Sequence, residues 1–447
     1  MNENFISIKT PRIIISGASS SSGKTTITCG LLRILSIRGY KISAYKTGPD
    51  YIDPQYLRHS GNCEAYNLDT WLMSQDLTRK LFALTSQDKN FAVIEGAMGL
   101  YDGGTHSSAS IAKLLNCPVI LVINAKSLGE SVGAIASGFR DYDKNINLAG
   151  VIINFAGSDS HVKIIADELR RSNINFLGAI KRDNNIMIPE RNLGLTPVNE
   201  QKIFNYDDLA QLIEESINLD EILRISQTAP ALKLEYKPAK KLSRKKVIAV
   251  AHDEAFNFYY PESLITLEKL GAKLIYFSPI HDKELPGADG YIFGGGFPEI
   301  FADKLSRNRS MLESVRNCNK KILAECGGFM YLCRSLKDLH GNIFEMSGLI
   351  NADSIMTSKP VIGYIQARAL SDNILCDLNK IICGHEFHYS RIILDSCDSC
   401  AFEFVRAKTG ETHKCGYVSE NILASYLHIN FFGNEKLAAK FLDSNER

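Results

Sequence analysis

At 447 residues the chain is too long for one ordinary core and has room for two large α/β units. Its composition is that of a globular protein, with 45% hydrophobic and 23% charged residues, and a formal net charge of +1 gives no bulk electrostatic reason to bind nucleic acid or an anionic membrane. Because no run of about 18 apolar residues is present and the first residues lack the features of a signal peptide, we expect a cytoplasmic protein without a transmembrane helix.

Residues 1–228 are predicted to form a parallel sheet covered by helices. Short apolar runs alternate with helical patterns, and this alternation is typical of buried strands joined by crossover helices. The expected strands are Ile13–Ile15, Lys41–Tyr45, Phe91–Ile94, Val119–Ile123 and Gly150–Ile153, and the expected helices include Lys24–Arg38, Ser107–Leu115, Asp159–Arg171 and one stretch over Tyr206–Ile225.

The chain changes character over residues 229–246, which are polar, contain Pro230 and Pro238, and gather seven basic residues from Lys233 to Lys246. This composition predicts a linker between domains. A second α/β pattern then fills residues 247–447. Its expected strands are Val247–Ala251, Lys273–Phe277, Gly290–Phe293 and Lys321–Ala324, its expected helices are Pro261–Leu270 and Lys304–Arg316, and the chain becomes richer in strands after Asn351.

The first strand is followed by a loop that suits a phosphate group. The segment Gly17–Thr26 reads GASSSSGKTT and joins a predicted strand to a predicted helix. Small residues there let backbone N–H groups surround phosphate oxygens at a helix N-terminus. We expect Lys24 to reach the β- and γ-phosphates of ATP and Thr25 to bind Mg²⁺, within a nucleotide site formed by Ser22, Gly23, Lys24, Thr25 and Thr26. The first glycine of the usual motif is displaced, since Ala18 follows Gly17.

Four carboxylates are expected near the same edge of the sheet. Glu95 follows the predicted strand Phe91–Ile94, Asp50 and Asp53 follow another strand, and Asp102 lies one loop beyond Glu95. Open α/β sheets bind ligands at the carboxyl ends of their strands, although an isolated loop Asp more often forms a turn or caps a helix. Asn154, at the end of a further strand, is a candidate for reading the adenine edge.

A second strand-to-helix turn carries a cysteine. Cys326 lies in AECGGFMYL, where a nucleophile is exposed on a tight turn and a helix N-terminus lowers its pKa. We expect backbone N–H groups of Gly295 and Gly296, in GGGFPE, and of Gly327 to form an oxyanion hole. The other ten cysteines are interpreted as ordinary thiols, including those of the single CxxC at Cys397–Cys400, which lacks a second pair at zinc spacing.

The cysteine needs a general base. His428 in SYLHINF is the best candidate, and His385 and His388 in GHEFHYS are its rivals.

These motifs are specific enough to indicate a family. The strings GGGFPE, AECGGFMYL, GHEFHYS and SYLHINF resemble those of class I glutamine amidotransferases of the cobyrinate/cobyrate-synthesis branch. The N-terminal half resembles the P-loop fold of dethiobiotin synthetase, whose phosphate loop has the same displaced glycine. With KTGPDYIDP, NLDTWLM and EGAMGLYDG, residues 10–435 are similar to the cobyrinate a,c-diamide synthases rather than to cobyrate synthases.

The resemblance implies roles for single residues. Cys326 matches the nucleophile and His428 its histidine, Lys24 and Thr25 match the nucleotide site, Asp50 and Glu95 match the Mg²⁺ ligands, and Asp53 and Asp102 match loops that face the carboxylate substrate. One departure concerns the acid that commonly follows the histidine by two residues. This chain has Asn430 there, which implies either a Cys–His dyad or an acid from elsewhere.

The implied activity is ATP-dependent amidation of the a and c carboxylates of cobyrinate, through an acyl phosphate and with ammonia from glutamine. Two alternatives stay open. The same chemistry could act on hydrogenobyrinate or a nickel sirohydrochlorin, or the first domain could be a nucleotide switch beside a degenerate amidotransferase module. Neither the order of the two amidations nor the oligomeric state is predicted.

Overall fold

The computed structural model describes residues 5–182, 190–191, 194–195, 205–235, 246–396 and 400–443. The chain divides into two units by its internal contacts. Unit 1 comprises residues 1–70 and 74–237, and unit 2 comprises residues 71–73 and 238–447. In unit 2 the indole N–H of Trp71 donates to the carbonyl of Gly384 at 2.9 Å. Among the described residues, none of the helices combines the length and the apolarity needed to span a bilayer.

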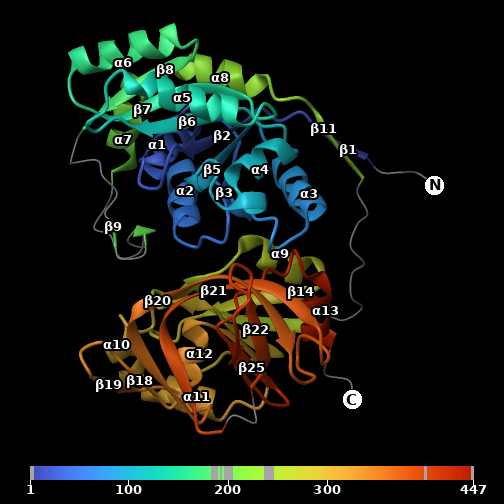
Figure 1. Cartoon of the computed structure of the whole chain (residues 1–447). Helices are drawn as coiled ribbons and strands as arrows, with labels where there is room; N and C mark the ends of the chain where they lie inside the picture. Colours follow the sequence, from blue (N-terminus) through green and yellow to red (C-terminus); the bar gives the residue numbers. More distant parts are fainter. Residues whose placement is uncertain are drawn as a thin grey trace. The chain divides into compact units, whose positions relative to one another are not determined.

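Unit 1 is built on a seven-stranded parallel sheet (Figure 1). Its strands, in spatial order, are β4 (Ala65–Leu68), β3 (Ile42–Thr47), β5 (Phe91–Gly99), β2 (Arg12–Gly17), β6 (Val119–Asn124), β7 (Leu148–Ala156) and β8 (Phe176–Lys181). The central strands are continuous apolar runs because helices cover both faces of the sheet. These helices are α1 (Lys24–Ile37), α2 (Asp53–Gly61), α3 (Gln75–Ser86), α4 (Ser108–Leu114), α5 (Ser131–Tyr142), α6 (Asp159–Arg171), α7 (Tyr206–Ser216) and α8 (Leu219–Gln227), with a short 3-10 turn at Gly104–His106.

Two short antiparallel pairs complete this unit. β1 (Phe5–Ile8) pairs with β11 (Leu232–Glu235), and β9 (Glu190–Arg191) pairs with β10 (Gly194–Leu195). β11 lies inside the segment predicted to be a linker, so residues 232–235 of that segment form a strand, and the linker stays a prediction. Residues 236–245 lie outside the described residues, as does Cys397 of the CxxC.

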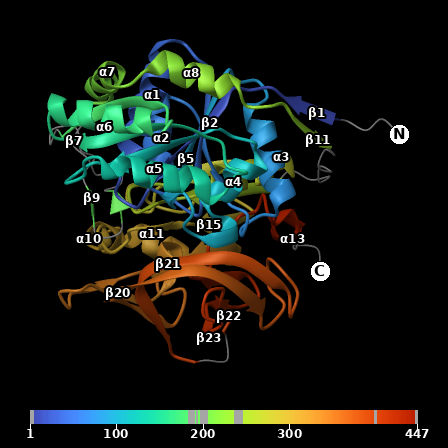
Figure 2. The same ribbon diagram turned by 45° about the horizontal axis from the view of Figure 1, so that its top comes forward.

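Unit 2 contains a mostly parallel sheet and a second, mostly antiparallel one. The first has the order β14 (Ala272–Phe277), β12 (Lys246–Ala251), β15 (Gly290–Phe293), β17 (Lys321–Glu325), β25 (Ile422–Ser425) and β24 (Tyr417–Val418), of which only the last pairing is antiparallel. The second comprises β19 (Ile343–Glu345), β18 (Ser335–Lys337), β20 (Ala352–Ala369), β21 (Ile381–Leu394), β22 (Phe402–Arg406) and β23 (Thr412–Cys415). The long β20–β21 pair curves through this sheet (Figure 2).

The remaining elements of unit 2 are a short strand pair and several helices. β13 (Phe256–Phe258) pairs with β16 (Gly295–Gly296), and the helices are α9 (Pro261–Lys269), α10 (Ala302–Arg307), α11 (Arg309–Arg316), α12 (Gly327–Leu332) and α13 (Glu435–Asp443). The predicted α/β fold class is confirmed, and so is the enrichment in strands after Asn351.

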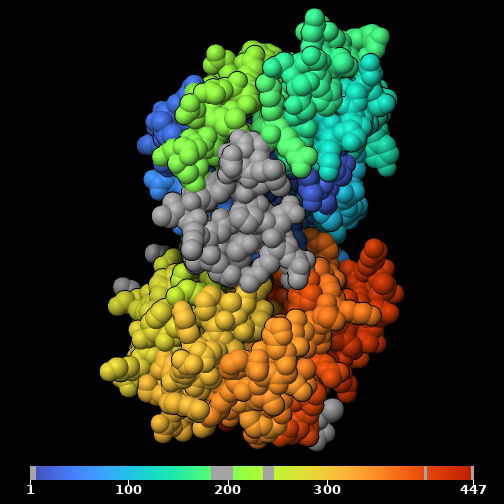
Figure 3. Space-filling view, turned by 90° about the vertical axis from the view of Figure 1, so that its left-hand side faces the viewer, coloured from blue at the N-terminus to red at the C-terminus, as the bar shows by residue number. Residues whose placement is uncertain are grey.

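Two predicted helices are each broken in two. The stretch 206–225 consists of α7 and α8, because Asn218 caps α8 through its side chain and Ile217 bridges to Gly178. The stretch 304–316 is divided at Asn308, whose side chain binds the carbonyls of Pro279 and Asp282. Figure 3 shows α7 and α8, in lime green, at the surface of unit 1. Helical periodicity continues through both breaks, which is why the sequence pattern did not reveal them.

Candidate functional sites

The phosphate loop connects β2 to α1 in unit 1. Gly23 has φ 85°, and α1 begins at Lys24 without any side-chain cap. The first backbone N–H groups of a 14-residue helix are therefore left for a ligand, and they carry the positive end of its dipole. Lys24 Nζ donates to the carbonyl of Ser19 at 3.2 Å and so lies over the loop. The structure places Ser22, Gly23, Lys24, Thr25 and Thr26 together at this helix start, and their contact with a polyphosphate stays a prediction.

A buried group of charges lies beside this loop. Glu95 is 0% exposed, and its Oε1 accepts hydrogen bonds from Thr25 Oγ1 and Lys46 Nζ, each at 2.7 Å. Lys46 also pairs with Asp53. Glu95 was predicted to follow its strand, but β5 continues to Gly99, and Glu95 pairs in register with Ile15 and Lys46. Buried charges of opposite sign compensate one another in this cluster.

Lys46 was missed by the sequence analysis. It lies next to last in β3, 3% exposed, at the same carboxyl edge of the sheet as the phosphate loop. Burial alone would lower the pKa of Lys46, but the carboxylates of Asp53 and Glu95 raise it above its usual value. Lys46 could have been recognised from the sequence as a lysine within a strand that is otherwise predicted to be buried. An ammonium group is rarely buried without a charged partner, so such a lysine indicates a nearby carboxylate.

Lys24 and Lys46 differ in the direction in which their pKa values are shifted. Burial, assisted by the nearby Lys46 ammonium, lowers the pKa of Lys24 to about 8. As the pH rises through 8, the free protein therefore loses the Lys24 charge while Lys46 keeps its own. We predict that affinity for a non-hydrolysable ATP analogue falls with increasing pH above 8, approaching about tenfold per pH unit. Calorimetric titration should detect this loss together with proton uptake on binding, and equal affinity at pH 7 and pH 9.5 would contradict it.

Asp50 and Asp102, two more of the predicted carboxylates, accept hydrogen bonds from nearby backbone N–H groups. Asp50 Oδ1 accepts from the backbone N–H groups of Ile52 (2.8 Å) and Asp53 (3.0 Å), which is the capping role that a loop Asp often has. Burial, followed by repulsion from Asp53, raises the pKa of Asp50 to about 7. Asp102 Oδ2 accepts from Gly99 N–H at 2.8 Å and thereby shapes the turn next to the loop. The substrate roles of Asp53 and Asp102 stay predictions.

Asn154 supports the phosphate loop in this structure. Its amide nitrogen donates to the carbonyl of Ser22 at 3.0 Å, and its oxygen accepts from its neighbour Phe155 N–H at 2.9 Å. A methyl group on Gly23 would lie 1.9 Å from that amide nitrogen, so Asn154 can occupy this position only if residue 23 has no side chain. Contact of Asn154 with adenine stays a prediction.

A magnesium ion would fit the oxygen atoms in this region. Thr25, Asp50 and Glu95 offer hard oxygen ligands, and Glu95 Oε2 is buried without a hydrogen-bond partner among the described residues. Within the described part of the chain, no group of three or more His, Cys, Asp and Glu residues could hold a metal by itself. Mg²⁺ commonly takes only one or two carboxylates together with substrate phosphates and water, and the residues present allow that arrangement.

In unit 2, Cys326 occupies a strained turn between β17 and α12. Its backbone has φ 49° and ψ −101°, an outlier for a residue with a side chain, and its Sγ approaches the carbonyl oxygen of Phe387 at 3.5 Å. Cys326 is only 5% exposed, and burial, followed by the carboxylate of Glu299, raises the pKa of its thiol. The expectations of an exposed thiol and a lowered pKa are therefore wrong for the free protein. Forming a thiolate requires a base that takes the proton.

The triple glycine packs directly against this turn. Gly328 N–H donates to the carbonyl of Gly294 at 2.9 Å, and a methyl group on Gly327 would lie 3.1 Å from Gly296 N. Gly294 N–H is not free, since it donates to Tyr259 Oη at 2.8 Å, and Gly295 and Gly296 pair with β13. The structure thus brings Gly295, Gly296 and Gly327 together, and their role as an oxyanion hole stays a prediction.

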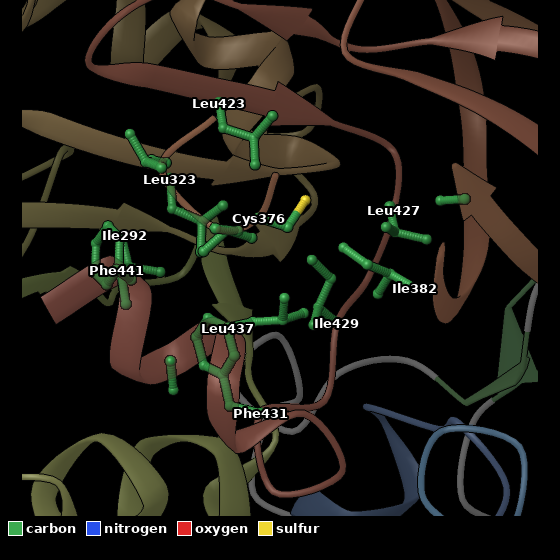
Figure 4. Close-up of a cluster of buried hydrophobic side chains, with 14 of the residues drawn as sticks. Ile292, Leu323, Cys376, Ile382, Leu423, Leu427, Ile429, Phe431, Leu437 and Phe441 are labelled. Atoms are coloured by element: carbon green, nitrogen blue, oxygen red, sulfur yellow. The ribbon is translucent and has the colours of Figure 1, made fainter. Parts of the chain in front are cut away.

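His428 is held in place by its neighbours in the chain. Leu427 and Ile429 on either side of it both enter the hydrophobic core of unit 2 (Figure 4), and this packing fixes the backbone on each side of the histidine. The ring itself is 0% exposed, and its Nδ1 lies 3.5 Å from Glu325 Oε2. A methyl group on Gly295 would lie 2.8 Å from His428 Cε1. The glycine turn, the residue before Cys326 and His428 therefore meet in one site.

The rival histidines have other contacts. The ring of His385 stacks on that of His428, with centroids 4.8 Å apart, and its Nε2 lies 2.7 Å from Tyr260 Oη. Burial, followed by the nearby His428, lowers the pKa of His385 well below its usual value, so His385 is neutral. His388 stacks on Tyr426 and its Nδ1 lies 2.8 Å from the carbonyl of Ser390. This geometry favours His428 as the base.

The close approach of Gly295 to His428 leads to a prediction. In Gly295→Ala the new methyl group must displace the imidazole, and a displacement of about 1 Å can cost roughly 10²-fold in rate. We expect glutamine hydrolysis to fall by about that factor without a change in ammonium-dependent synthesis. Gly287→Ala is the matched control, because a methyl group there has nothing within 4 Å. Equal glutaminase rates in the two variants would show that His428 is not displaced.

Two family models match the chain. Residues 13–195 match a CobQ/CobB/MinD/ParA nucleotide binding domain, and residues 247–436 match a CobB/CobQ-like glutamine amidotransferase domain. These ranges contain the phosphate loop and the Cys326 turn, respectively. Chloroplast FtsY from Physcomitrella patens is 13% identical, with a TM-score of 0.31 over 46% of this chain and 65% of its own, which is too low to inform the fold.

Curated relatives match over nearly their whole length. A protein of Caldanaerobacter subterraneus subsp. tengcongensis is 41% identical over 96% of this chain and 97% of its own, and one of Picrophilus torridus is 39% identical over 98% and 99%. One of Leptospira interrogans is 37% identical over 98% of this chain and 99% of its own. All three are named cobyrinate a,c-diamide synthase.

Proposed function

This chain belongs to the cobyrinate a,c-diamide synthase family, and we propose that it amidates the a and c carboxylates of cobyrinate with ATP and glutamine. The observation that carries the proposal is the presence of two different sites in one chain. A phosphate loop with buried compensating charges suits carboxylate activation, and a strained cysteine beside a buried histidine suits amide cleavage. The cytoplasm is the compartment that we propose for this reaction.

In unit 2, the reaction begins with transfer of the Cys326 proton to His428. The thiolate sulfur then attacks the side-chain carbonyl carbon of glutamine, and the negative oxygen that forms is directed at the backbone N–H groups of the glycine turn. His428 returns the proton to the amide nitrogen, the C–N bond breaks, and ammonia leaves. Water, deprotonated by His428, attacks the glutamyl thioester, which releases glutamate and restores the thiol.

In unit 1, the substrate carboxylate oxygen attacks the γ-phosphorus of ATP, and ADP leaves. Lys24, Lys46 and the N-terminal N–H groups of α1 offset the negative charge that develops on the transferred group. A magnesium ion held by Thr25, Glu95 and Asp50 would neutralise further phosphate charge. Ammonia then attacks the acyl carbon, phosphate leaves, and an amide replaces the carboxylate. A second cycle amidates the other carboxylate.

The test is a mass-spectrometric assay of cobyrinate incubated with this protein, ATP, Mg²⁺ and glutamine. We expect two successive mass changes, each corresponding to conversion of one carboxylate to an amide. Hydrogenobyrinate and nickel sirohydrochlorin are assayed in parallel because they offer similar acetate side chains. The proposal fails if cobyrinate is unchanged, and its substrate is wrong if another macrocycle is amidated much faster.

A further inference from the structure

The residue in the usual place of the acid does not serve His428. Asn430 follows His428 by two positions, but its carboxamide is used elsewhere. Its nitrogen donates to Glu262 Oε1 at 2.8 Å, and its oxygen accepts from Gly433 N–H at 3.1 Å. An amide also carries no charge with which to stabilise an imidazolium ion.

A carboxylate approaches His428 from another element. Glu325 ends β17, directly before Cys326, and its Oε2 lies 3.5 Å from His428 Nδ1. Its Oε1 accepts from the backbone N–H of Ile429 at 3.3 Å. The pairing of β17 with β25, in which Glu325 is opposite Ser425, fixes both backbones. One carboxylate thus contacts the ring of residue 428 and the backbone of residue 429.

We propose that Glu325 is the positioning residue of the amidotransferase site: it orients His428 and stabilises the imidazolium that forms when Cys326 loses its proton. The inference rests on the proposed roles of Cys326 and His428. The separation of 3.5 Å is longer than an ordinary hydrogen bond, and contacts of this kind in a free enzyme tighten in the catalytic complex. Glu325 and Cys326 are adjacent in sequence, so one turn would supply both the nucleophile and the acid.

The surrounding charges indicate which group Glu325 can stabilise during the reaction. Beside the thiol, Glu325 is unfavourable, because after burial and Glu299 it is a further cause of the raised Cys326 pKa. It can favour the reaction only by stabilising the proton acceptor. His385, which lies against the face of the His428 ring, is neutral and buried and supplies no negative charge. Glu325 is the carboxylate whose contact with His428 Nδ1 is seen.

The test is Glu325→Gln in the full-length protein, compared with Glu299→Gln. Both variants remove a negative charge that acts on the Cys326 thiol, but only the first removes the carboxylate at His428 Nδ1. Gln keeps an acceptor for Ile429 N–H. We expect kcat for glutamine hydrolysis to fall by roughly 10²- to 10⁴-fold in Glu325→Gln and to change little in Glu299→Gln. Ammonium-dependent synthesis should be unchanged in both.

The pH profile separates positioning from a merely structural role. His428 must be neutral to accept the thiol proton, so its protonation sets the acid limb of kcat/KM for glutamine hydrolysis. Loss of the carboxylate destabilises the imidazolium, and this limb should therefore move to lower pH in Glu325→Gln only. An unmoved limb or a near-normal rate would overturn the proposal. If thermal melting shows that Glu325→Gln is unfolded, the same pH profile is measured for Glu325→Asp, which keeps the carboxylate. A limb near the wild-type pH in Glu325→Asp would support the positioning role of Glu325, and a displaced limb would overturn it. Persistence of glutamine hydrolysis in Cys326→Ser would instead refute the underlying site.

Discussion

Replacing Cys326 with serine should reduce glutamine-dependent synthesis by at least about 10⁴-fold and leave ammonium-dependent synthesis intact. A serine hydroxyl is a much weaker nucleophile than a thiolate, and the buried turn that already raises the thiol pKa gives no help in ionising it. Ammonium salts supply ammonia without the thioester, so the phosphate-loop site can still act. Product mass spectrometry with each nitrogen source measures both activities in one preparation.

Cys333 provides the matched control for this experiment. It follows the same helix, is fully buried, and its thiol contacts only the carbonyl of Phe329 among the hydrogen bonds seen, at 3.2 Å. Cys333→Ser should therefore retain both activities, apart from a modest loss of stability. If glutamine-dependent synthesis survived in Cys326→Ser but failed in Cys333→Ser, Cys333 would be the nucleophile and the assignment of Cys326 would be wrong.

The fold was predictable where the sequence pattern is local. Apolar runs such as Val119–Ile123 and the helical pattern of Asp159–Arg171 correspond closely to β6 and α6, since buried parallel strands and amphipathic helices have distinct periodicities. The breaks at Asn218 and Asn308 were missed because they depend on a side-chain cap and on carbonyls about 30 residues away. The β1–β11 pair was missed because its two strands are more than 200 residues apart in sequence.

In the candidate sites, too, residues in local motifs were predictable from the sequence, and residues whose role depends on distant neighbours were not. Lys24 and Cys326 stand in local motifs whose spacing carries the chemistry, so their sequence context was sufficient. Lys46 and Glu325 were not proposed, because their significance comes from neighbours on other strands: Lys46 from Glu95, and Glu325 from His428. The thiol pKa was predicted in the wrong direction, since the helix N-terminus is visible in sequence and the extent of burial is not.

Lys24→Ala should lower synthesis from both glutamine and ammonium by roughly 10²- to 10³-fold, the usual cost of removing one charged stabiliser of a transition state. Glutamine hydrolysis, which belongs to unit 2, should continue. Lys113→Ala is the control, because Lys113 is a partly exposed lysine of unit 1 that pairs with Asp143 at the surface. Ammonium-dependent synthesis at the normal rate in Lys24→Ala would show that the loop does not serve carboxylate activation.

The same variant tests a nucleotide switch against an amidating enzyme. A switch hydrolyses ATP without a carboxylate acceptor, whereas a synthetase should form ADP only when the macrocycle is present to receive the phosphoryl group. Lys24 lies over the phosphate loop, while Lys46 also pairs with Glu95 and Asp53, so we expect Lys24 to contribute more than Lys46 to offsetting the charge of the transferred phosphoryl group. We therefore expect the wild-type protein to show macrocycle-dependent ADP formation that falls in Lys24→Ala by the same factor as synthesis. Full ATP hydrolysis in the absence of any carboxylate substrate would instead favour the switch.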